Sequence, residues 1–561
     1  MNKRTSSHSS VAPLKNRNGD IVACDKDKAN LLNDFFGSVC TQDNGSNPQF
    51  EPRVNGDEIN TVKFDAAKVI AAAKRMKTKR PLSSGPDGYP VMLLNNTVNV
   101  LSYPLAQMFQ SYISVGKLPS CWKTAIVTPI YKKGPSSDPN NYRPISQTSI
   151  FYKLLERVLV ADITFYMMQK GSITRHQHGF INRRSTTTNL LETMSDWTLS
   201  IDNKQTQSIV YVDFSKAFDS VSRPKLITKL QGYGISGDLL NLISDFLSNR
   251  SQRTRIGRSL SESVDLTSGI VQGSCLGPLL FLIFINDLAD IFDNEVTPKF
   301  YADDLKLYTS IESNLDNARL QRNIDRLVDW ASKWQLPISI QKCQVMQVGN
   351  KRRSEPIKTV ISLGTAVLPT CNTIRDLGIH VDDELKFSEH INLIVSKALS
   401  RSYLLRKCFV SRDRDTLVKG FTVYVRPLLE YCSTVWSPHL HKDIEAIERV
   451  QRRFTKYLPG LRSYDYTDRL KIVGLERLEI RRIRFDLIMA YKIIFGLTCL
   501  QLEDFFQFSP CSSTRGHEYK LLVLGAKCDT RKYFFSVRIC QIWNDLPNDT
   551  DFGSLENIKT Y

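Results

Sequence analysis

Three aspartates stand where the chain could hold divalent metal ions. Asp303 and Asp304 lie in KFYADDLKLYT (residues 299–309), whose apolar and β-prone flanks predict a hairpin that presents both carboxylates at its turn. Asp213 ends the apolar, strand-like run SIVYVDF, where a buried carboxylate needs a cation as its partner. If this strand lies beside the hairpin, the three carboxylates converge on one place.

Such a group has enough acidic oxygens to hold two Mg²⁺ ions about 3.5–4 Å apart. A pair of this kind serves phosphoryl transfer, because one ion lowers the pKa of an attacking hydroxyl while the other neutralises a triphosphate and its leaving group. Adjacent aspartates at a tight turn are also common as solvated turn residues, which is the alternative interpretation of Asp303 and Asp304. The strand that ends at Asp213 favours the metal interpretation.

The elements that would position these residues form an α/β pattern. Between about residues 120 and 350, short β-like runs alternate with helical stretches, and beyond about residue 384 long amphipathic helices dominate. The first 80 residues are polar and predicted to be partly disordered, with a helical patch around Ala29 to Phe36. We therefore divide the chain into an N-terminal extension (1–80), an α+β region (81–383) and a helical C-terminal region (384–561).

Composition indicates a polyanionic partner. Lys and Arg outnumber Asp and Glu by 75 to 57, which gives a net charge of +18. The 12 cysteines show no Cys-x-x-Cys pair. The first residues lack the apolar core of a signal peptide, and the longest apolar run, residues 279–285, is too short to span a bilayer. We expect an intracellular protein of the nucleus, the cytoplasm or both, with no membrane partner.

The chain resembles the reverse transcriptases of retrotransposons without long terminal repeats. In order along the sequence it shows GPDGYP (85–90), WKTAIVTPIYKKG (122–134), NYRPIS (141–146), QHGFINRRST (177–186), VYVDFSKAFDSV (210–221), SGIVQGSCLGPLLFLIFINDL (268–288), YADD (301–304) and QKC (341–343). Beyond these blocks, RDLGIHVDD (375–383), YVRPLLEYCSTVWSP (424–438), IERVQRRFTKYLPG (447–460) and IWNDLP (542–547) resemble the jockey and chicken-repeat lineage.

The resemblance implies a right-hand polymerase, with fingers and palm in residues 81–383 and a helical thumb and C-terminal region in 384–561. It implies an RNA-directed DNA polymerase, a nucleotidyltransferase that extends a primer 3′-hydroxyl with dNTPs on an RNA template. Two Mg²⁺ ions, with Mn²⁺ as a substitute, would be the cofactors. The partners would be the RNA template, the DNA primer and the dNTPs.

Matching positions assign roles to single residues. Asp213, Asp303 and Asp304 match the catalytic metal ligands of the family. Phe218 matches the steric gate that excludes a 2′-hydroxyl, although a packed core phenylalanine is the alternative. Gln272 matches the residue that steadies the sugar, and Gly273 lets the backbone approach the nucleotide closely.

Basic residues complete the assignment. Arg143 and either Lys132 or Lys133 match the fingers residues that hold the triphosphate, and the sequence leaves open which lysine serves. Lys342 matches the late lysine proposed as the general acid for pyrophosphate. The asparagine that commonly precedes it is Ser339 here, and a surface lysine is the alternative.

The helical C-terminal region carries paired arginines that could meet phosphates of the template and primer. These are Arg452, Arg453, Arg481, Arg482 and Arg484. A basic run, KRMKTKR (74–80), could contact phosphate or direct nuclear entry.

Two other functions stay open at this stage. One is a catalytically inactive, truncated remnant that binds nucleic acid, since no constellation of an upstream apurinic-type endonuclease is seen in the first 80 residues. The other is an RNA-dependent RNA polymerase, against which Phe218 and Ala302 both argue.

Overall fold

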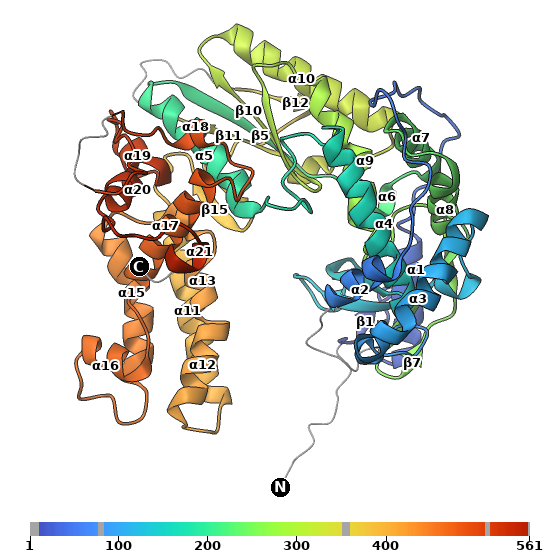
Figure 1. Cartoon of the computed structure of the whole chain (residues 1–561), viewed down its shortest axis with the longest axis horizontal. Helices are drawn as coiled ribbons and strands as arrows, with labels where there is room; N and C mark the ends of the chain where they lie inside the picture. Colours follow the sequence, from blue (N-terminus) through green and yellow to red (C-terminus); the bar gives the residue numbers. More distant parts are fainter. Residues whose placement is uncertain (1–10, 77–83, 350–358, 511–515, 559–561) are drawn as a thin grey trace. The chain divides into compact units, whose positions relative to one another are not determined.

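The computed structural model describes residues 11–76, 84–349, 359–510 and 516–558 (Figure 1). Part of the basic run 74–80 and the first ten residues lie outside these ranges. The chain forms two compact units. Unit 1 comprises Met1–Gln177, Asp213–Phe292 and Asp325–Ser339, and unit 2 comprises His178–Val212, Asp293–Ile324 and Ile340–Tyr561. Each unit is therefore built from segments far apart in the sequence.

Unit 1 contains a sheet in the order β4-β3-β6-β7, with β8 also paired to β6. Its strands are β3 (Thr124–Tyr131), β4 (Tyr142–Gln147), β6 (Arg250–Ile256), β7 (Ser259–Leu260) and β8 (Val264–Leu266), preceded by the small pair β1 (Leu14–Lys15) and β2 (Ile21–Val22). The helices are α1 (Asp25–Gly37), α2 (Ala66–Lys74), α3 (Val91–Val115), α4 (Ile150–Gln169), α6 (Ala217–Ser220), α7 (Arg223–Gly232), α8 (Gly237–Leu247) and α9 (Gly277–Ile285). β3 and β4 form an antiparallel hairpin, whereas β3 and β6 run parallel.

The N-terminal extension takes part in this unit. α1 covers the helical patch expected around residues 29–36, and its apolar side chains join one buried cluster with Val127 of β3, Tyr142 of β4 and Ile256 of β6. Helix α1 of the extension thus packs on the sheet through apolar burial, whereas α2 packs against α3 and α4.

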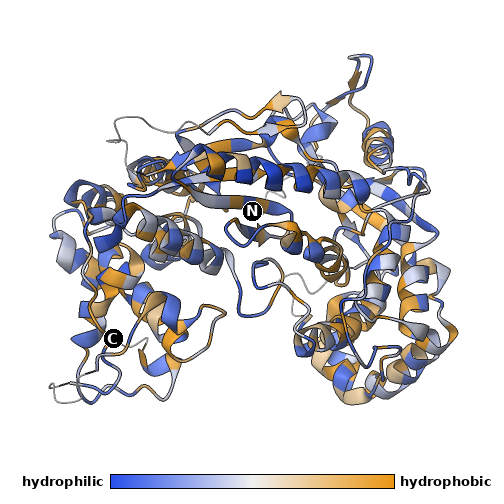
Figure 2. Ribbon diagram, turned by 90° about the horizontal axis from the view of Figure 1, so that it is seen from above, coloured by the Kyte–Doolittle hydropathy of each residue, from blue (hydrophilic) through white to orange (hydrophobic). Residues whose placement is uncertain are grey.

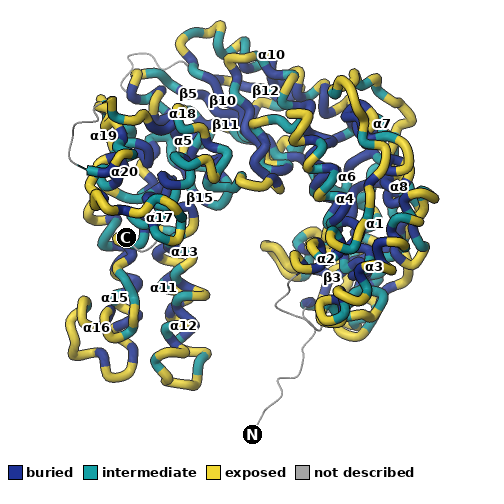
Figure 3. Tube along the Cα trace, viewed as in Figure 1, coloured by how far each residue is buried: buried dark blue, intermediate teal, exposed yellow. Residues whose placement is uncertain are grey.

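Unit 2 contains a four-stranded sheet in the order β11-β5-β10-β9. Its strands are β5 (Thr206–Val212), β9 (Thr297–Tyr301), β10 (Asp304–Ile311) and β11 (Gln344–Val348), and all three pairings are antiparallel. β5 is mostly buried, as its run of Ile, Val and Tyr predicts. Figure 3 shows the same strands as largely buried.

Helix α5 (Thr186–Asp202) packs against this sheet. It begins with a capping box, in which Ser185 and Thr188 satisfy each other's backbone N–H groups. Trp197 on α5 meets Tyr308 of β10 edge to face, with ring centroids 5.7 Å apart. α5 therefore fixes one face of the strands that carry the predicted catalytic residues.

The C-terminal region of unit 2 is mainly helical, as predicted. Before it lie the short pairs β12 (Ser362–Leu363) with β13 (Ala366–Val367) and β14 (Thr373–Asp376) with β15 (Ile379–Asp382). The helices are α11 (Ser388–Cys408), α12 (Arg414–Tyr424), α13 (Arg426–Glu430), α14 (Ser433–Trp436), α15 (His441–Lys456), α16 (Tyr466–Val473), α17 (Leu478–Ile494), α18 (Leu502–Phe505), α19 (Asp529–Lys532), α20 (Phe535–Asn544) and α21 (Leu555–Ile558). α10 (Asn314–Lys333) has residues in both units.

One apolar core runs through unit 2. It joins α5 and the sheet to α11, α15, α17 and α20, so the C-terminal helices pack on the same side as α5. Figure 2 shows that many helices carry separate hydrophobic and hydrophilic faces, as amphipathic packing requires. The α+β class expected from the sequence is confirmed by these antiparallel sheets and helices.

None of the helices in the described part of the chain combines the length and the apolar character needed to cross a bilayer.

Candidate active site

The predicted hairpin is present, with both aspartates at its turn. Asp304 pairs with Tyr301, so Ala302 and Asp303 form a two-residue connection between β9 and β10. Ala302 has φ +57°, the left-handed conformation that a type II′ turn places at its first central position and that usually selects glycine. Alanine in this conformation costs on the order of 1 kcal/mol, which the surrounding sheet must offset. The turn holds Asp303 and Asp304 next to each other at one end of the sheet.

Asp213 directly follows the last residue of β5. Its carbonyl oxygen accepts the Ser339 N–H at 2.7 Å, and Ser215 donates its N–H to Pro337 O, also at 2.7 Å. Ser339, which departs from the asparagine of the family pattern, thus contributes through its backbone. These two bonds fix the chain on either side of Phe214, and with it the direction in which Asp213 leaves the strand.

The strand register relates Asp213 to the hairpin. Val212 of β5 pairs with Leu305 of β10, and these residues are the immediate chain neighbours of Asp213 and Asp304. Asp213 is the residue after Val212, and Asp304 is the residue before Leu305. The two aspartates are thus chain neighbours of the same paired position in the sheet. The prediction that this strand lies beside the hairpin is confirmed by the pairing of β5 with β10.

A buried ion pair supports this part of the sheet, and the sequence analysis missed it. Lys306 of β10 lies opposite Tyr211 of β5, and its Nζ lies 2.6 Å from Oδ2 of Asp376. The Tyr211 hydroxyl donates to the same carboxylate oxygen at 3.3 Å. Burial lowers the pKa of Lys306, and the carboxylate of Asp376 opposes that shift. A lysine inside an otherwise apolar strand is the signal that could have revealed such a pair.

The predicted sugar-contacting residues meet in unit 1. Phe218 lies in α6 and stacks on Phe281 of α9, with ring centroids 4.3 Å apart and 18° between the planes. Its carbonyl accepts the Ile270 N–H at 2.8 Å. Two residues further on, the carbonyl of Gln272 accepts the Ser146 N–H at 2.9 Å. Phe218 and Gln272 are therefore tied through one short loop to β4.

Asp219 is a residue of this site that the sequence analysis missed. Nε2 of Gln272 donates to Oδ1 and Oδ2 of Asp219 at 2.8 and 2.9 Å. Burial raises the pKa of Asp219, and the hydrogen bonds from Gln272 act in the opposite direction. The Gln272 amide is thus held by its nitrogen on the Asp219 carboxylate, which orients its Oε1 as an acceptor. In the sequence, the signal that could have identified Asp219 was its position directly after Phe218.

The backbone conformation at residue 273 and the lack of space around it permit only glycine. Its φ is +108°, and a Cβ atom at this position would lie 2.4 Å from the carbonyl oxygen of Ser146. The backbone of the loop therefore runs directly against β4.

The predicted triphosphate ligands lie on the β3–β4 hairpin. Arg143 on β4 pairs with Ile130 on β3 and is exposed. Lys132 and Lys133 follow β3 and are also exposed, and the Lys132 N–H donates to Asn141 O at 2.7 Å. Three cationic side chains thus belong to one hairpin, and both lysines stay candidates.

Lys342 is exposed at the end of a short 3-10 turn, Ile340–Lys342. Gln344, two residues later, pairs with Tyr211 near the end of β5. Because β11 is antiparallel to β5, Lys342 lies toward the same end of the sheet as the hairpin turn.

The five arginines expected to meet phosphate differ in what they contact. Arg481 is paired with Glu430, Arg484 with Glu476 and Arg452 with Glu445, while Arg482 is buried. Of the five, Arg453 alone is exposed without a carboxylate ion pair among the described residues. It remains the candidate phosphate contact of this group.

Unit 2 also contains a second group of side chains of metal-ligating types. His178, Glu192 and Cys499 have ligand atoms within 4.8 Å of one another. However, Lys299 already pairs with the Glu192 carboxylate, and His178 Nε2 lies 3.3 Å from it. These partners satisfy the carboxylate, so we assign no metal to this group.

Comparison with known proteins links this site to the reverse transcriptases. The family described as reverse transcriptase (RNA-dependent DNA polymerase) matches residues 130–381, which include Asp213, Phe218, Gln272 and the hairpin. Over these residues, which make up less than half of its length, the chain is similar to the reverse transcriptases of retrotransposons without long terminal repeats. The RNA-directed DNA polymerase from mobile element jockey of Drosophila melanogaster is 26% identical over 431 residues, which cover 73% of this chain and 46% of that protein.

Two further matches complete the comparison. The probable RNA-directed DNA polymerase from transposon BS of Drosophila melanogaster is 28% identical over 362 residues, covering 62% of this chain and 40% of the relative. The chain thus spans less than half the length of these curated relatives. Among solved structures, telomerase from Candida albicans in complex with a fragment of telomeric RNA gives a TM-score of 0.34 at 11% identity, covering 67% of this chain and 68% of that one.

Proposed function

We propose that the chain is an RNA-directed DNA polymerase that extends a primer 3′-hydroxyl with dNTPs. The observation that carries the proposal is the register of β5 and β10, which sets Val212 opposite Leu305 and so brings Asp213 to the end of the sheet that presents Asp303 and Asp304. The match of residues 130–381 to the reverse transcriptase family supports it.

The donor set suits hard divalent cations. Three carboxylates provide oxygen ligands at the ends of two paired strands, and a site with so few protein ligands leaves room for the water and phosphate oxygens that Mg²⁺ retains. Reverse transcriptases use divalent metals, and we propose two Mg²⁺ ions, replaceable by Mn²⁺, held by Asp213, Asp303 and Asp304. When bound, such ions lower the pKa of the 3′-hydroxyl and neutralise the triphosphate.

The residues of unit 1 would select and orient the nucleotide. The Phe218 ring, fixed by its stack on Phe281, would fill the space of a 2′-hydroxyl and so favour deoxynucleotides. Oε1 of Gln272 is oriented by Asp219 and would accept a hydrogen bond from the sugar. Gly273 would let the backbone approach the nucleotide without a side chain.

Charge on the β3–β4 hairpin would position the triphosphate. The Arg143 guanidinium can bind two phosphate oxygens at once, and Lys132 or Lys133 would add a point charge. Lys342 would donate a proton to the leaving pyrophosphate from the same end of the sheet as the carboxylates. Arg453 would contact the backbone of the RNA template or the DNA primer.

Primer extension tests the proposal. Purified protein with a primed RNA template, dNTPs and Mg²⁺ should extend the primer, chelation should stop extension, and added Mg²⁺ should restore it. Asp303→Asn should lower incorporation by at least about 10³-fold, because the metal ligand set is incomplete. Asp468→Asn is the matched control, since Asp468 is exposed and its contact with Lys471 is a surface ion pair.

Two outcomes would contradict the proposal. Salt-dependent nucleic-acid binding without synthesis on any template would favour the inactive, nucleic-acid-binding alternative. Equal incorporation of rNTPs and dNTPs by the wild-type chain would favour an RNA polymerase instead.

A further inference from the structure

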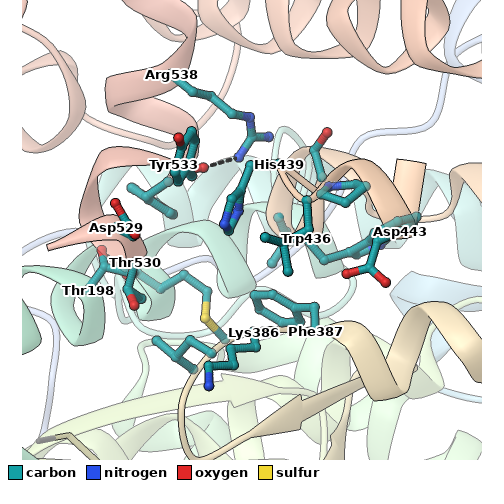
Figure 4. Close-up of a pocket in the computed structure, with 17 residues that line it drawn as sticks. Thr198, Lys386, Phe387, Trp436, His439, Asp443, Asp529, Thr530, Tyr533 and Arg538 are labelled. Carbon is teal, nitrogen blue, oxygen red and sulfur yellow. Dashed lines mark hydrogen bonds between the residues drawn. The ribbon is translucent and has the colours of Figure 1, made fainter. Parts of the chain in front are cut away.

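Unit 2 contains a cavity of about 250 Å³ that the polymerase site does not use (Figure 4). We call it the C-terminal pocket. It is lined by residues of α5, of the segment before α11, of the stretch from α14 to α15, and of the stretch from α19 to α20. Four separate stretches of sequence thus meet around one space within a single compact unit.

Aromatic rings form much of the wall. Trp436 is only 1% exposed and Phe387 is also buried, so both present fixed surfaces to the cavity. The rings of His439 and Tyr533 lie face to face, with centroids 3.9 Å apart and 1° between their planes. Burial lowers the pKa of His439, which keeps the imidazole neutral near pH 7. A planar ligand would find ready stacking surfaces here.

The stacked pair is held in place before any ligand binds. Arg538 donates to the backbone carbonyls of Tyr533 and Thr434 at 3.0 and 2.7 Å, and it also bonds both carboxylate oxygens of the buried Asp486. Figure 4 shows the first of these bonds beside His439. Because the stacked rings of His439 and Tyr533 are already fixed, little conformational freedom is lost when a ligand binds.

Two carboxylates provide acceptors in the same space. Asp443 is 5% exposed; its Oδ2 accepts from the Ser388 hydroxyl at 2.7 Å, and no described residue donates to its other oxygen. Asp529 is exposed, and none of the described residues forms a hydrogen bond with its carboxylate. In Figure 4 Asp529 and Asp443 lie on either side of His439 and Trp436. Acceptors of this kind require N–H or O–H donors on the ligand.

The surroundings of the pocket favour a polyanion. Three exposed lysines surround it: Lys386 is one of its lining residues, and Lys442 and Lys532 are each next in sequence to a lining residue. Residues 397–495 hold nearly twice as many Lys and Arg as Asp and Glu. This charge repels a basic peptide and attracts the phosphates of a nucleic acid strand, whereas the carboxylates inside the pocket repel phosphate itself. The occupant should therefore be a base, with its backbone outside.

We infer that the C-terminal pocket binds one unstacked guanine of the RNA on which the enzyme acts. Guanine combines a planar ring for stacking with adjacent N1–H and N2–H donors, which match one carboxylate in a two-bond arrangement. Adenine presents an acceptor at N1 and lacks this pair of donors. The inference rests on the proposed function only in taking RNA as the partner.

Fluorescence anisotropy with labelled oligouridine RNA of about 12 nucleotides tests the inference. An oligomer with one central guanosine should bind about tenfold more tightly than one with adenosine, and inosine, which lacks the 2-amino group, should lie between them. Asp529→Asn should remove most of the preference for guanosine. Asp549→Asn, another exposed aspartate of the same unit, should leave it unchanged.

His439→Ala should weaken binding of the guanosine and adenosine oligomers alike, because stacking does not distinguish them. Equal affinity for all oligomers, or an unaltered preference in Asp529→Asn, would overturn the inference. So would a more than tenfold preference for the matching DNA oligomer, or competition by an arginine-rich peptide in the absence of any preference for guanosine.

The readout is independent of polymerisation. Asp303→Asn should retain the preference for guanosine, so a failure of primer extension and a failure of guanine binding can be told apart. Because Asp529 is exposed, its substitution should not unfold the protein, which keeps the test valid if a change at the buried Asp443 does.

Discussion

The carboxylate end of the four-stranded sheet and the C-terminal pocket are assembled in opposite ways. The first comes from two short segments whose neighbouring residues pair in the sheet, Val212 with Leu305 and Tyr301 with Asp304. The second comes from four separated stretches, which contribute between two and seven lining residues each. A site of the first kind can be recognised as a motif, whereas a site of the second kind becomes visible only after the helices have packed.

The strongest way to separate the two sites is to remove a carboxylate at the sheet. Asp213→Asn should lower dNTP incorporation by at least about 10³-fold, because a neutral amide binds a divalent ion poorly. Its affinity for guanosine-containing RNA should stay unchanged. Parallel primer-extension and anisotropy measurements would check both statements, and a matching loss of RNA binding would show that the two regions are not independent.

Whether a region can be predicted from the sequence depends on how far apart in the chain its contacting residues lie. The hairpin at Asp303, the strand before Asp213 and α1 were predicted correctly, because local alternation and turn residues determine them. The parallel pairing of β3 with β6 was not predicted, because it joins residues more than 100 positions apart. Asp219 and Asp376 were missed for the same reason, since each is bonded to a residue far away in the sequence, and Asp529 was missed because it lines a pocket that forms only when distant helices pack together.

The proposed steric-gate role of Phe218 can be tested separately from the packing of its ring. Phe218→Val should reduce discrimination against rNTPs by about 10- to 200-fold, because the smaller side chain leaves room for a 2′-hydroxyl. Competition between rNTPs and dNTPs in primer extension measures this ratio. Phe281→Leu is the control, since it removes the same ring stack without changing residue 218. An equal effect of both variants on the ratio would indicate a purely structural role for Phe218.

A smaller effect is expected where the backbone, and not a side chain, is proposed to meet the nucleotide. Gly273→Ala should lower kcat/KM for dNTPs by about tenfold, because its Cβ would lie 2.4 Å from the Ser146 carbonyl and shift the loop. Gly19→Ala has a similar positive φ, +90°, but nothing within 4 Å of the added Cβ. Steady-state kinetics that show equal losses for both variants would attribute the effect to backbone strain alone.

The smallest effect concerns α5, which packs behind the sheet and also lines the pocket. Burial would raise the pKa of Glu192, but hydrogen bonds from His178 and Lys299 lower it to about 2, compared with 4.5 for an ordinary glutamate. Since the folded-state pKa is the lower one, its contribution to stability is fully present above about pH 4.5 and is lost as the pH falls through 2.

Glu192→Gln should therefore lower the free energy of unfolding by roughly 2–3 kcal/mol at pH 7, and the difference from wild type should shrink as the pH approaches 2. Urea denaturation at a series of pH values measures this difference. A difference that stays constant with pH would mean that the carboxylate charge of Glu192 does not stabilise α5. Both sites would then depend on apolar packing of that helix, through Trp197 and Tyr308, and not on its ion pair.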